Sequence, residues 1–417
     1  MVVTLGTQRL RRRSAGIIVA MAMLAVACGG GAGEETDGAG ASASDGTPSS
    51  ASTADASSTA TETEQAEAPV AEPDADPFDR ITATVEAFVE DEQLEGAGLL
   101  IVDVDDGVVY EEYFGAFGPD RISLIASASK MISAGVLLKL QQDGLLDLDA
   151  PVEDQVGWAV GNPDITPAQL VSNSAGLVGL RPDPLYAPYL CQWAAATTLQ
   201  QCGETVFTTT ADDDDQIPPD TGFRYGGAQW QIAGAVAESV SGKSWAELID
   251  EIYVEPCGVE SLGYINLGAV LTASTSGYPT VFGGEPDSVE PSDNPNIEGG
   301  AYITAPDYAT LLLMHLRDGT CGDEEIFSRQ SLDTMYADRI DEVYDGDAWG
   351  GDFGYGMGWW IDRTTGRIAD PGAWGASPWL DLDDGYGAYL IIEDSSDNGE
   401  QLSEQLTDLV HAAVVGA

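Results

Sequence analysis

Apolar side chains recur at a helical period in several parts of the chain. Over residues 77–90 they predict a first helix, in which Ile81, Val85, Phe88 and Val89 share one face. The same period predicts further helices over residues 127–142, 228–240, 245–253, 305–317 and 403–415. Helices are therefore expected at both ends of the folded region and through its middle.

Short runs of β-branched and aromatic residues predict strands in two places. Residues 98–104 and 108–114 flank an Asp-Asp-Gly sequence, and Asp-Gly is a typical hairpin turn. Near the other end of the chain, strands are predicted over residues 356–362, 374–381 and 387–392. Strands at both ends with helices between them predict one sheet built from both ends, with a helical lobe inserted at about residues 145–310.

The first 27 residues have the composition of a bacterial signal peptide. Four arginines precede an apolar run from Ala15 to Ala27 that is short for a membrane span. Cys28 follows Ala-Val-Ala, which resembles a lipobox. We therefore expect Cys28 to be lipidated and the protein to be anchored outside the cytoplasm on the bacterial membrane. Ordinary signal cleavage beside an unrelated cysteine is the alternative.

Residues 28–76 are mostly Gly, Ala, Ser, Thr, Pro and acidic residues, with almost no large apolar side chain. Such a segment cannot bury enough surface to offset the entropy of ordering it. It is predicted to be a disordered tether, and the folded domain is expected over residues 77–417.

The charge of the chain narrows the range of partners. Lys and Arg number 16 against 70 Asp and Glu, so the formal net charge is -54. Only eleven of the acidic residues precede residue 79, so the acidity belongs to the folded part. Repulsion from phosphate excludes nucleic acid as a partner and leaves the lipid anchor as the only expected membrane contact.

Four cysteines lie in the expected domain, namely Cys191, Cys202, Cys257 and Cys321. In an exported protein an even set of cysteines indicates disulfides, and four cysteines allow three pairings. We favour Cys191–Cys202, which closes a short loop, and Cys257–Cys321 then remains as the second bond. Metal binding is the alternative, but no Cys-x-x-Cys or His cluster supports it. No metal or cofactor is predicted.

The candidate chemistry centres on Ser127 and Lys130. The chain has only two histidines, His315 and His411, both in apolar helical runs, and no Gly-x-Ser-x-Gly elbow. Ser127 and Lys130 are three residues apart at the start of a predicted helix, so their side chains project on one face. An apolar setting favours a neutral amine, which can take a proton from a serine hydroxyl.

This motif and its flanks resemble the serine β-lactamase-like hydrolases, the family of class C β-lactamases, DD-peptidases and related esterases. The matching segments are Ser-Ala-Ser-Lys at 127–130 with the stretch to residue 152, residues 165–177, Phe-Arg-Tyr-Gly-Gly at 223–227, and residues 299–308. With the third landmark at 370–372, they place the resemblance over roughly residues 80–395. It implies an α/β (α+β) fold of the β-lactamase/transpeptidase type, a mixed, mainly antiparallel sheet flanked by helices plus an inserted helical lobe.

The resemblance implies roles for several residues. Ser127 would be the nucleophile, Lys130 its activating partner and Tyr225 a proton shuttle. Because a cation favours a phenolate, Lys130 is expected to lower the pKa of Tyr225 and make it a base near neutral pH. Gly372 would permit a close backbone approach, and the N–H groups of Ala373 and Ser127 would form an oxyanion hole.

Three landmark positions depart from the family pattern. Asn173 replaces a His, Gly227 replaces an Asn, and Asp370 replaces a Lys or His. These residues are expected to contact the substrate, with Trp374 and Trp379 as walls of an apolar pocket or, alternatively, as core residues. Like charges about 4 Å apart repel by about 1 kcal/mol in water and about 4 kcal/mol in a partly shielded site. Asp370 is therefore expected to disfavour penicillins and peptide C-termini, which carry a carboxylate.

The sequence thus predicts an exported serine hydrolase that forms an acyl-enzyme on Ser127. The expected substrates are small neutral or cationic esters or amides. The alternatives are a catalytically inactive β-lactamase-like binding protein, a β-lactamase or DD-peptidase proper, and a transpeptidase that uses the same residues.

Overall fold

The computed structural model describes residues 76–180, 186–209, 215–271, 277–348 and 351–416. The predicted signal peptide over 1–27, the lipidation site Cys28 and all but the last residue of the predicted tether lie outside the described residues. Within the described residues, no helix combines the length and apolar character needed to cross a membrane.

A seven-stranded sheet forms the first layer of the fold. The strands lie in the order β2-β1-β12-β11-β10-β9-β8, and every neighbouring pair is antiparallel. The prediction of one sheet built from both ends of the domain is confirmed. The bounds are β1 Gly96–Asp103, β2 Gly107–Gly115, β8 Phe353–Tyr355, β9 Trp360–Asp362, β10 Ile368–Ala369, β11 Ala376–Asp381 and β12 Tyr386–Ile391.

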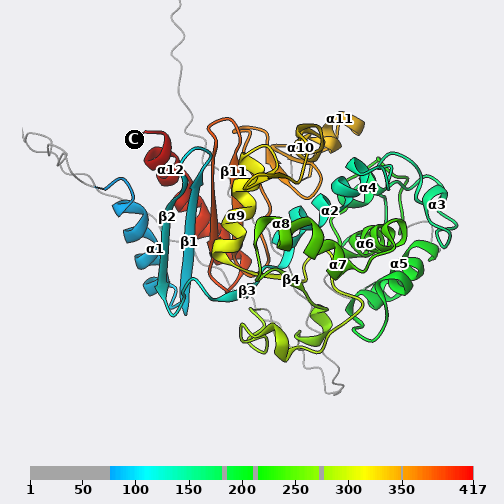
Figure 1. Cartoon of the computed structure of the whole chain (residues 1–417), viewed down its shortest axis with the longest axis horizontal. Coiled ribbons are helices and arrows are strands. Elements are labelled where there is room, and N and C mark those ends of the chain that lie inside the picture. The colour runs from blue at the N-terminus through cyan, green and yellow to red at the C-terminus, as the bar shows by residue number, and fades with distance from the viewer. Residues whose placement is uncertain (1–75, 181–185, 210–214, 272–276, 349–350, 417) are drawn as a thin grey trace, which may run out of the picture. The chain divides into compact units, whose positions relative to one another are not determined.

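Helices cover both faces of this sheet. Helices α1 (Asp79–Asp91) and α12 (Ser396–Val415) lie on one face, and α9 (Ala305–Leu316) lies on the other (Figure 1). Because side chains alternate along a strand, Leu99 of β1 packs with the first pair of helices whereas Leu100 packs in the core on the opposite face. Central strand β1 is therefore apolar on both faces.

The middle of the chain forms the predicted helical lobe, shown in green in Figure 1. Its helices are α3 Val152–Gln155, α4 Pro167–Val171, η2 Ala187–Trp193, α5 Leu199–Thr208, α6 Gly227–Ser241, α7 Trp245–Ile249, η3 Asp250–Val254 and α8 Glu255–Cys257. Helix α2 (Lys130–Gln142) packs against α6 of the lobe and against α10 (Arg329–Tyr336). It therefore lies where the lobe meets the rest of the domain.

Smaller elements complete the described chain. A three-stranded sheet has the order β3-β5-β4, and a two-stranded hairpin joins β6 to β7. Their bounds and those of the remaining helices are β3 Ile122–Leu124, β4 Gly263–Tyr264, β5 Ala301–Thr304, β6 Thr320–Cys321, β7 Glu324–Glu325, η1 Ala126–Ser129, η4 Leu267–Ala269, η5 Pro286–Ser288 and α11 Arg339–Tyr344.

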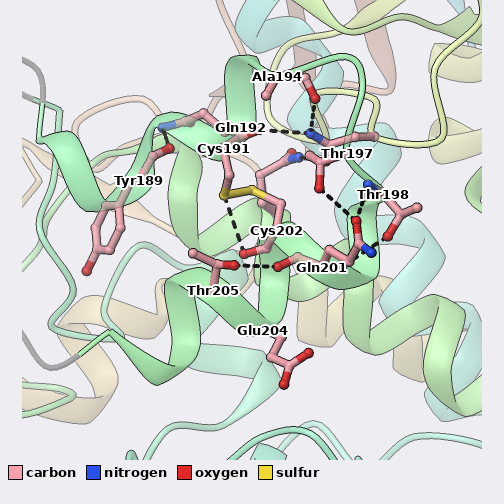
Figure 2. The surroundings of a disulfide bond; sticks show 12 residues. Tyr189, Cys191, Gln192, Ala194, Thr197, Thr198, Gln201, Cys202, Glu204 and Thr205 are labelled. Atoms are coloured by element: carbon pink, nitrogen blue, oxygen red, sulfur yellow. Dashed lines mark hydrogen bonds between the residues drawn. A yellow bond between two sulfur atoms is a disulfide. The ribbon is translucent and has the colours of Figure 1, made fainter.

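Both predicted disulfides are confirmed. Cys191 of η2 is bonded to Cys202 of α5, and Figure 2 shows this bond among the polar contacts of the loop between them. Cys257, which ends α8, is bonded to Cys321 of β6. The second bond therefore ties the lobe to the hairpin that follows α9.

Several predicted boundaries differ from those observed. The helix predicted from residue 127 starts as the 3₁₀ turn η1, and α2 begins only at Lys130. The strand predicted over 356–362 is reduced to β9, because Gly358 has a φ of 83° that a strand does not accommodate. Helix α12 begins seven residues before the predicted position, where Ser395 caps it by accepting the N–H of Asn398.

Candidate active site

Ser127 lies in a tight turn between β3 and α2. Ala126 has a φ of 47°, which is unusual for a residue with a Cβ, and its carbonyl accepts the hydroxyl of Ser129 at 2.6 Å. Ser129 in turn accepts the N–H of Ala301 at 3.1 Å, which ties the turn to β5. Ser127 itself is 8% exposed. The turn is therefore held in a strained conformation by its neighbours.

Lys130 begins α2 and is 1% exposed. Its Nζ donates to the carbonyl oxygen of Glu298 at 2.8 Å and lies 4.7 Å from the centre of the Tyr225 ring. A second aromatic ring, that of Trp230, has its centre 5.8 Å from the same nitrogen. The amine is thus buried among one carbonyl and two aromatic faces, which stabilise a cation.

Tyr225 precedes α6 and reaches the same place from the helical lobe. Its carbonyl accepts the N–H of Leu180 at 2.6 Å. Its phenol oxygen is buried and has no hydrogen-bond partner among the described residues, yet Lys130 and Ser127 lie near enough to influence its pKa. The structure therefore brings together the three residues predicted as catalytic, from elements separated by about 95 residues of chain.

The prediction that Lys130 makes Tyr225 a base is wrong in the resting structure. Burial raises the pKa of Tyr225, and the opposing attraction of Lys130 does not compensate for it. The nearby carboxyl group of Asp370 raises this pKa further. The phenol therefore keeps its proton in the resting structure.

Gly372 and Ala373 lie against the nucleophile turn, as the resemblance implies. A Cβ on Gly372 would lie only 2.1 Å from the carbonyl oxygen of Ile125, so no larger residue fits there without movement. The N–H of Ser127 precedes the first hydrogen bond of η1, from Ala128 to Ile125, so the helix offers it no acceptor. These contacts bring the backbone of Gly372 against the turn that contains Ser127, and Ala373 is the next residue along the chain.

The expectation that Asp370 meets the substrate is wrong. Asp370 is 0% exposed, and its Oδ2 accepts the N–H of Met131 at 2.9 Å, at the start of α2. Burial raises the pKa of this carboxyl well above its usual value, although Lys130 opposes the rise. An enclosed carboxyl group that meets no substrate and whose ionisation is opposed by burial does not repel a substrate carboxylate, so the charge argument made from the sequence fails.

Three other expected contact residues are also internal. Asn173 is 0% exposed, and its Oδ1 accepts Gln229 Nε2 at 2.7 Å, so it supports the turn that carries Tyr225. Trp374 is 0% exposed and packs under the nucleophile turn, whereas Trp379 packs in the core formed with α1 and α12. The alternative of core packing is correct for both tryptophans.

Two features of the site escaped the sequence analysis. The first is Glu298, whose main-chain oxygen accepts Lys130 Nζ and whose buried carboxyl group lies against Gly227. The second is a group of aromatic rings around Tyr225: the centre of its ring lies 5.4 Å from that of Trp360 and 6.3 Å from that of Phe223. Both Phe223 and Trp360 are partly exposed. Trp360 is far from Tyr225 in the sequence, so no local pattern links the two. Only the Phe-Arg-Tyr sequence at 223–225 indicates that Phe223 and Tyr225 lie close together.

The histidines lie outside this arrangement. His315 is buried on α9, where burial lowers its pKa to about 3, and its Nδ1 lies 2.6 Å from the hydroxyl of Tyr336. His411 lies on α12, and its Nδ1 is 3.6 Å from Asp384 Oδ2. His411, Asp384 and Asp381 have ligand atoms within 4.8 Å of one another, at the far end of β11 from Ala373.

A family model described as Beta-lactamase matches residues 81–410 of this chain. The chain belongs to the beta-lactamase family. The family consists of serine hydrolases and related proteins that share the fold described above, and the match covers the strained turn of Ser127, the turn of Tyr225 and the approach of Gly372.

Known relatives agree with this assignment. Penicillin-binding protein 4 of Amycolatopsis lactamdurans is 24% identical over 253 residues, which cover 57% of this chain and 64% of that protein. The chain thus matches less than two thirds of the length of that curated relative.

Solved structures show the same fold. A beta-lactamase candidate from Bacteroides dorei DSM 17855 is 26% identical with a TM-score of 0.63, over 80% of this chain and 99% of its own. EstCE1, described as a hydrolase with promiscuous acyltransferase activity, is 19% identical with a TM-score of 0.65, over 81% of this chain and 98% of its own.

Proposed function

We propose that this protein is a serine hydrolase that forms an acyl-enzyme on Ser127 and releases the acyl group to water. The observation that carries the proposal is the meeting of Ser127, Lys130 and the unpartnered phenol of Tyr225 beside the backbone of Gly372. A buried hydroxyl without a partner is costly, which is consistent with a group that awaits a substrate atom.

The proposed reaction follows from the protonation of these groups. In the proposed reactive form the amine of Lys130 has given up its proton to solvent, and it accepts the proton of Ser127 as Oγ attacks the carbonyl carbon. Tyr225, whose pKa burial raises, donates its proton to the leaving group, and Lys130 returns a proton to the phenolate. The N–H groups of Ser127 and Ala373 stabilise the negative charge on the carbonyl oxygen. Water then repeats the sequence in reverse and frees Ser127.

The proposed substrates are small neutral or cationic esters or amides with an apolar group. The partly exposed rings of Phe223 and Trp360 beside Tyr225 supply apolar surface for that group. No lysine follows Lys243 in the sequence, and the net charge of -54 repels anions in general. The negative charge of the protein thus supports the preference for neutral or cationic substrates that the sequence analysis attributed to Asp370.

The first experiment is intact-mass analysis of the domain from residue 77 after exposure to a fluorophosphonate probe. A single adduct on Ser127, absent from Ser127→Ala, supports the proposed nucleophile. No adduct in a folded protein would instead favour the inactive binding protein. If Ser127 is labelled, turnover of a p-nitrophenyl ester against a penicillin separates an esterase from a β-lactamase, and rapid penicillin turnover would refute the proposed substrate class.

We also propose that the protein is exported and held on the bacterial membrane only through a lipid on Cys28. Two disulfides in the domain support export, because such bonds persist in oxidising compartments. In cells, the full chain is expected in the membrane fraction and Cys28→Ser in the soluble fraction. Equal membrane retention of both proteins would refute the anchor.

A further inference from the structure

The loop that presents the proposed proton-donating phenol is bonded to the short segment that follows α4. The N–H of Asp220 donates to the carbonyl of Ser174 at 2.8 Å, and the N–H of Arg224 donates to the carbonyl of Asn173 at 2.8 Å. On the other side of the phenol, the N–H of Gly226 donates to Asn173 Oδ1 at 3.4 Å. The segment after α4 is therefore the support on which the phenol is placed.

Both sides of this contact have an unusual backbone. Asn173 has a φ of 56° and Asp220 has a φ of 54°, which residues with a Cβ rarely adopt. Such conformations persist only where the surrounding contacts hold them. The two segments also pass very close, since a Cβ on Gly176 would lie 2.0 Å from the carbonyl oxygen of Ile217. The loop therefore depends on contacts from outside it to keep this shape.

An ion pair with α11 supplies such contacts. Arg339 begins α11, which lies beside α4 (Figure 1), and its Nη1 and Nη2 donate to Asp220 Oδ1 at 2.8 Å and Oδ2 at 3.2 Å. Nη1 also donates to Ser174 Oγ at 2.9 Å and to Ser172 Oγ at 3.2 Å. Asp220 Oδ2 further accepts Gln169 Nε2 of α4 at 2.7 Å. The pair therefore joins the loop, its support and α11 at one point.

The geometry of this pair makes it stronger than an ordinary surface ion pair. The Arg339 and Asp220 side chains are 13% and 20% exposed, and the guanidinium meets both carboxylate oxygens. Two parallel hydrogen bonds fix direction as well as distance, and partial burial limits screening by water. Because α11 packs against β8, the pair links the loop of the helical lobe to the edge of the seven-stranded sheet.

We propose that Arg339 and Asp220 are positioning residues of this active site, whose ion pair holds the loop so that the Tyr225 phenol reaches the leaving group. Both act on the phenol through the main chain of its neighbours. The inference rests on the proposed function, because the phenol has a proton to deliver only if Ser127 is acylated.

The dependence of the reaction on the leaving group reports the position of Tyr225. An alkoxide is a strong base and needs a proton as its bond to the acyl carbon breaks, whereas p-nitrophenolate leaves as a stable anion. The proton of Tyr225 therefore matters much more for an ethyl ester than for the p-nitrophenyl ester of the same acid. Because kcat/KM covers only the steps up to release of the leaving group, hydrolysis of the acyl-enzyme does not enter the comparison.

Arg339→Met removes the ion pair and keeps an apolar side chain of similar length. A displacement of Tyr225 by about 1 Å should lower kcat/KM for the ethyl ester about a hundredfold, with the p-nitrophenyl ester changed by less than about threefold. Arg363→Met is the matched control, since Arg363 pairs with Asp338 and these side chains are 24% and 18% exposed. Equal losses with the two esters, or the same selective loss in Arg363→Met, would overturn the inference.

Further variants separate positioning from a general loss of structure, with circular dichroism as the check on folding. Asp220→Asn removes the charge but little volume, and it should show the same selective loss. Arg339→Lys keeps the cation without the two-pronged guanidinium, so it should recover part of the ethyl-ester rate. In a Tyr225→Phe background, which has no proton to donate, Arg339→Met should change kcat/KM by less than about threefold. A hundredfold loss in that background would contradict the positioning role.

Hydrogen exchange measures the loop itself without requiring activity. The amides of Asp220 and Arg224 should exchange about tenfold faster in Arg339→Met than in the wild type or in Arg363→Met. Unchanged exchange would overturn the claim that the pair holds the loop. If the wild type takes no fluorophosphonate label on Ser127, the proposed function fails and the catalytic purpose of the pair fails with it, whereas hydrogen exchange still decides whether the pair holds the loop.

Discussion

Gly372→Ala should slow the proposed reaction without removing any side chain of the site. The φ of Gly372 lies outside the range of +20° to +160° that L residues rarely adopt, so the backbone torsion itself tolerates alanine. The added Cβ, however, would lie 2.1 Å from the carbonyl oxygen of Ile125 and 3.1 Å from its carbonyl carbon. Carbon and carbonyl oxygen atoms usually stay about 3.3 Å or more apart, so the two backbones must separate by about 1 Å.

That separation acts directly on the proposed oxyanion hole. Ala373 follows the substituted residue, and Ser127 lies two residues after Ile125, so the two N–H groups move apart together with the backbones. A misplacement of about 1 Å can cost about a hundredfold in rate, and loss of one oxyanion donor costs about a hundred- to a thousandfold. We therefore expect Gly372→Ala to react about a hundredfold more slowly.

The assay is the rate of Ser127 phosphonylation, followed by intact mass, together with kcat/KM for a p-nitrophenyl ester. Gly299→Ala is the matched control, because its Cβ would also face the nucleophile turn but at 3.5 Å from Ala126 C, an ordinary contact. Circular dichroism checks that both variants are folded. If Gly372→Ala reacts as fast as Gly299→Ala, the close approach of Gly372 does not position the oxyanion donors.

Three further outcomes are expected. Burial opposes ionisation of Asp220, but hydrogen bonds from Arg339 and other groups keep its pKa below the usual value. Ionised Asp220 therefore stabilises the folded state fully above the unfolded pKa of about 4, and this stability is lost as the pH falls from there through the lower folded pKa. Asp220→Asn should lower the free energy of unfolding by about 2 kcal/mol at neutral pH but not in acid; an equal deficit at all pH values would contradict this. Replacing Cys257 and Cys321 by alanine should lower the free energy of unfolding by about 4 kcal/mol, and replacing Cys191 and Cys202, which close a shorter loop, by about 3 kcal/mol. Denaturant titration of the oxidised proteins measures both values, and the reverse order would exclude loop entropy as the main cause. Asp370→Asn should leave the ratio of ester to penicillin turnover within about threefold, since the carboxyl group is enclosed and burial opposes its ionisation. A large gain in penicillin turnover would restore the charge argument.

Local patterns were sufficient for the elements and for much of the site. Helical periodicity located α2, α6 and α9 to within a few residues, and the Asp-Gly turn located the β1–β2 hairpin. The three-residue spacing of Ser127 and Lys130 and the Tyr-Gly-Gly turn identified groups that the structure brings together. These inferences succeeded because periodicity, turn chemistry and motif spacing are properties of short stretches of chain.

Such local patterns could not predict the protonation state of Tyr225 or the side-chain orientation of Asp370. The attraction between Lys130 and Tyr225 was foreseeable, but the sign of the pKa shift depends on burial, which the packed lobe imposes. The sequence placed Asp370 near the correct turn, but its side chain points inward and accepts the N–H of Met131 at the start of α2. Successive side chains of an extended chain point to opposite sides, so a shift of one residue decides whether a side chain points inward or outward. Both errors came from assigning exposure without the tertiary structure.

The sequence by itself determined the strands at both ends, the helical middle, both disulfides and the positions of Ser127, Lys130 and Tyr225. Only the tertiary structure decided that Glu298 fills the space beside Gly227, 71 residues away, and that Phe223 meets Trp360. The physical reason is that desolvation and steric exclusion depend on every atom packed around a group. Those atoms come from segments that no local pattern links, so the surroundings of each site residue exist only once the chain has folded.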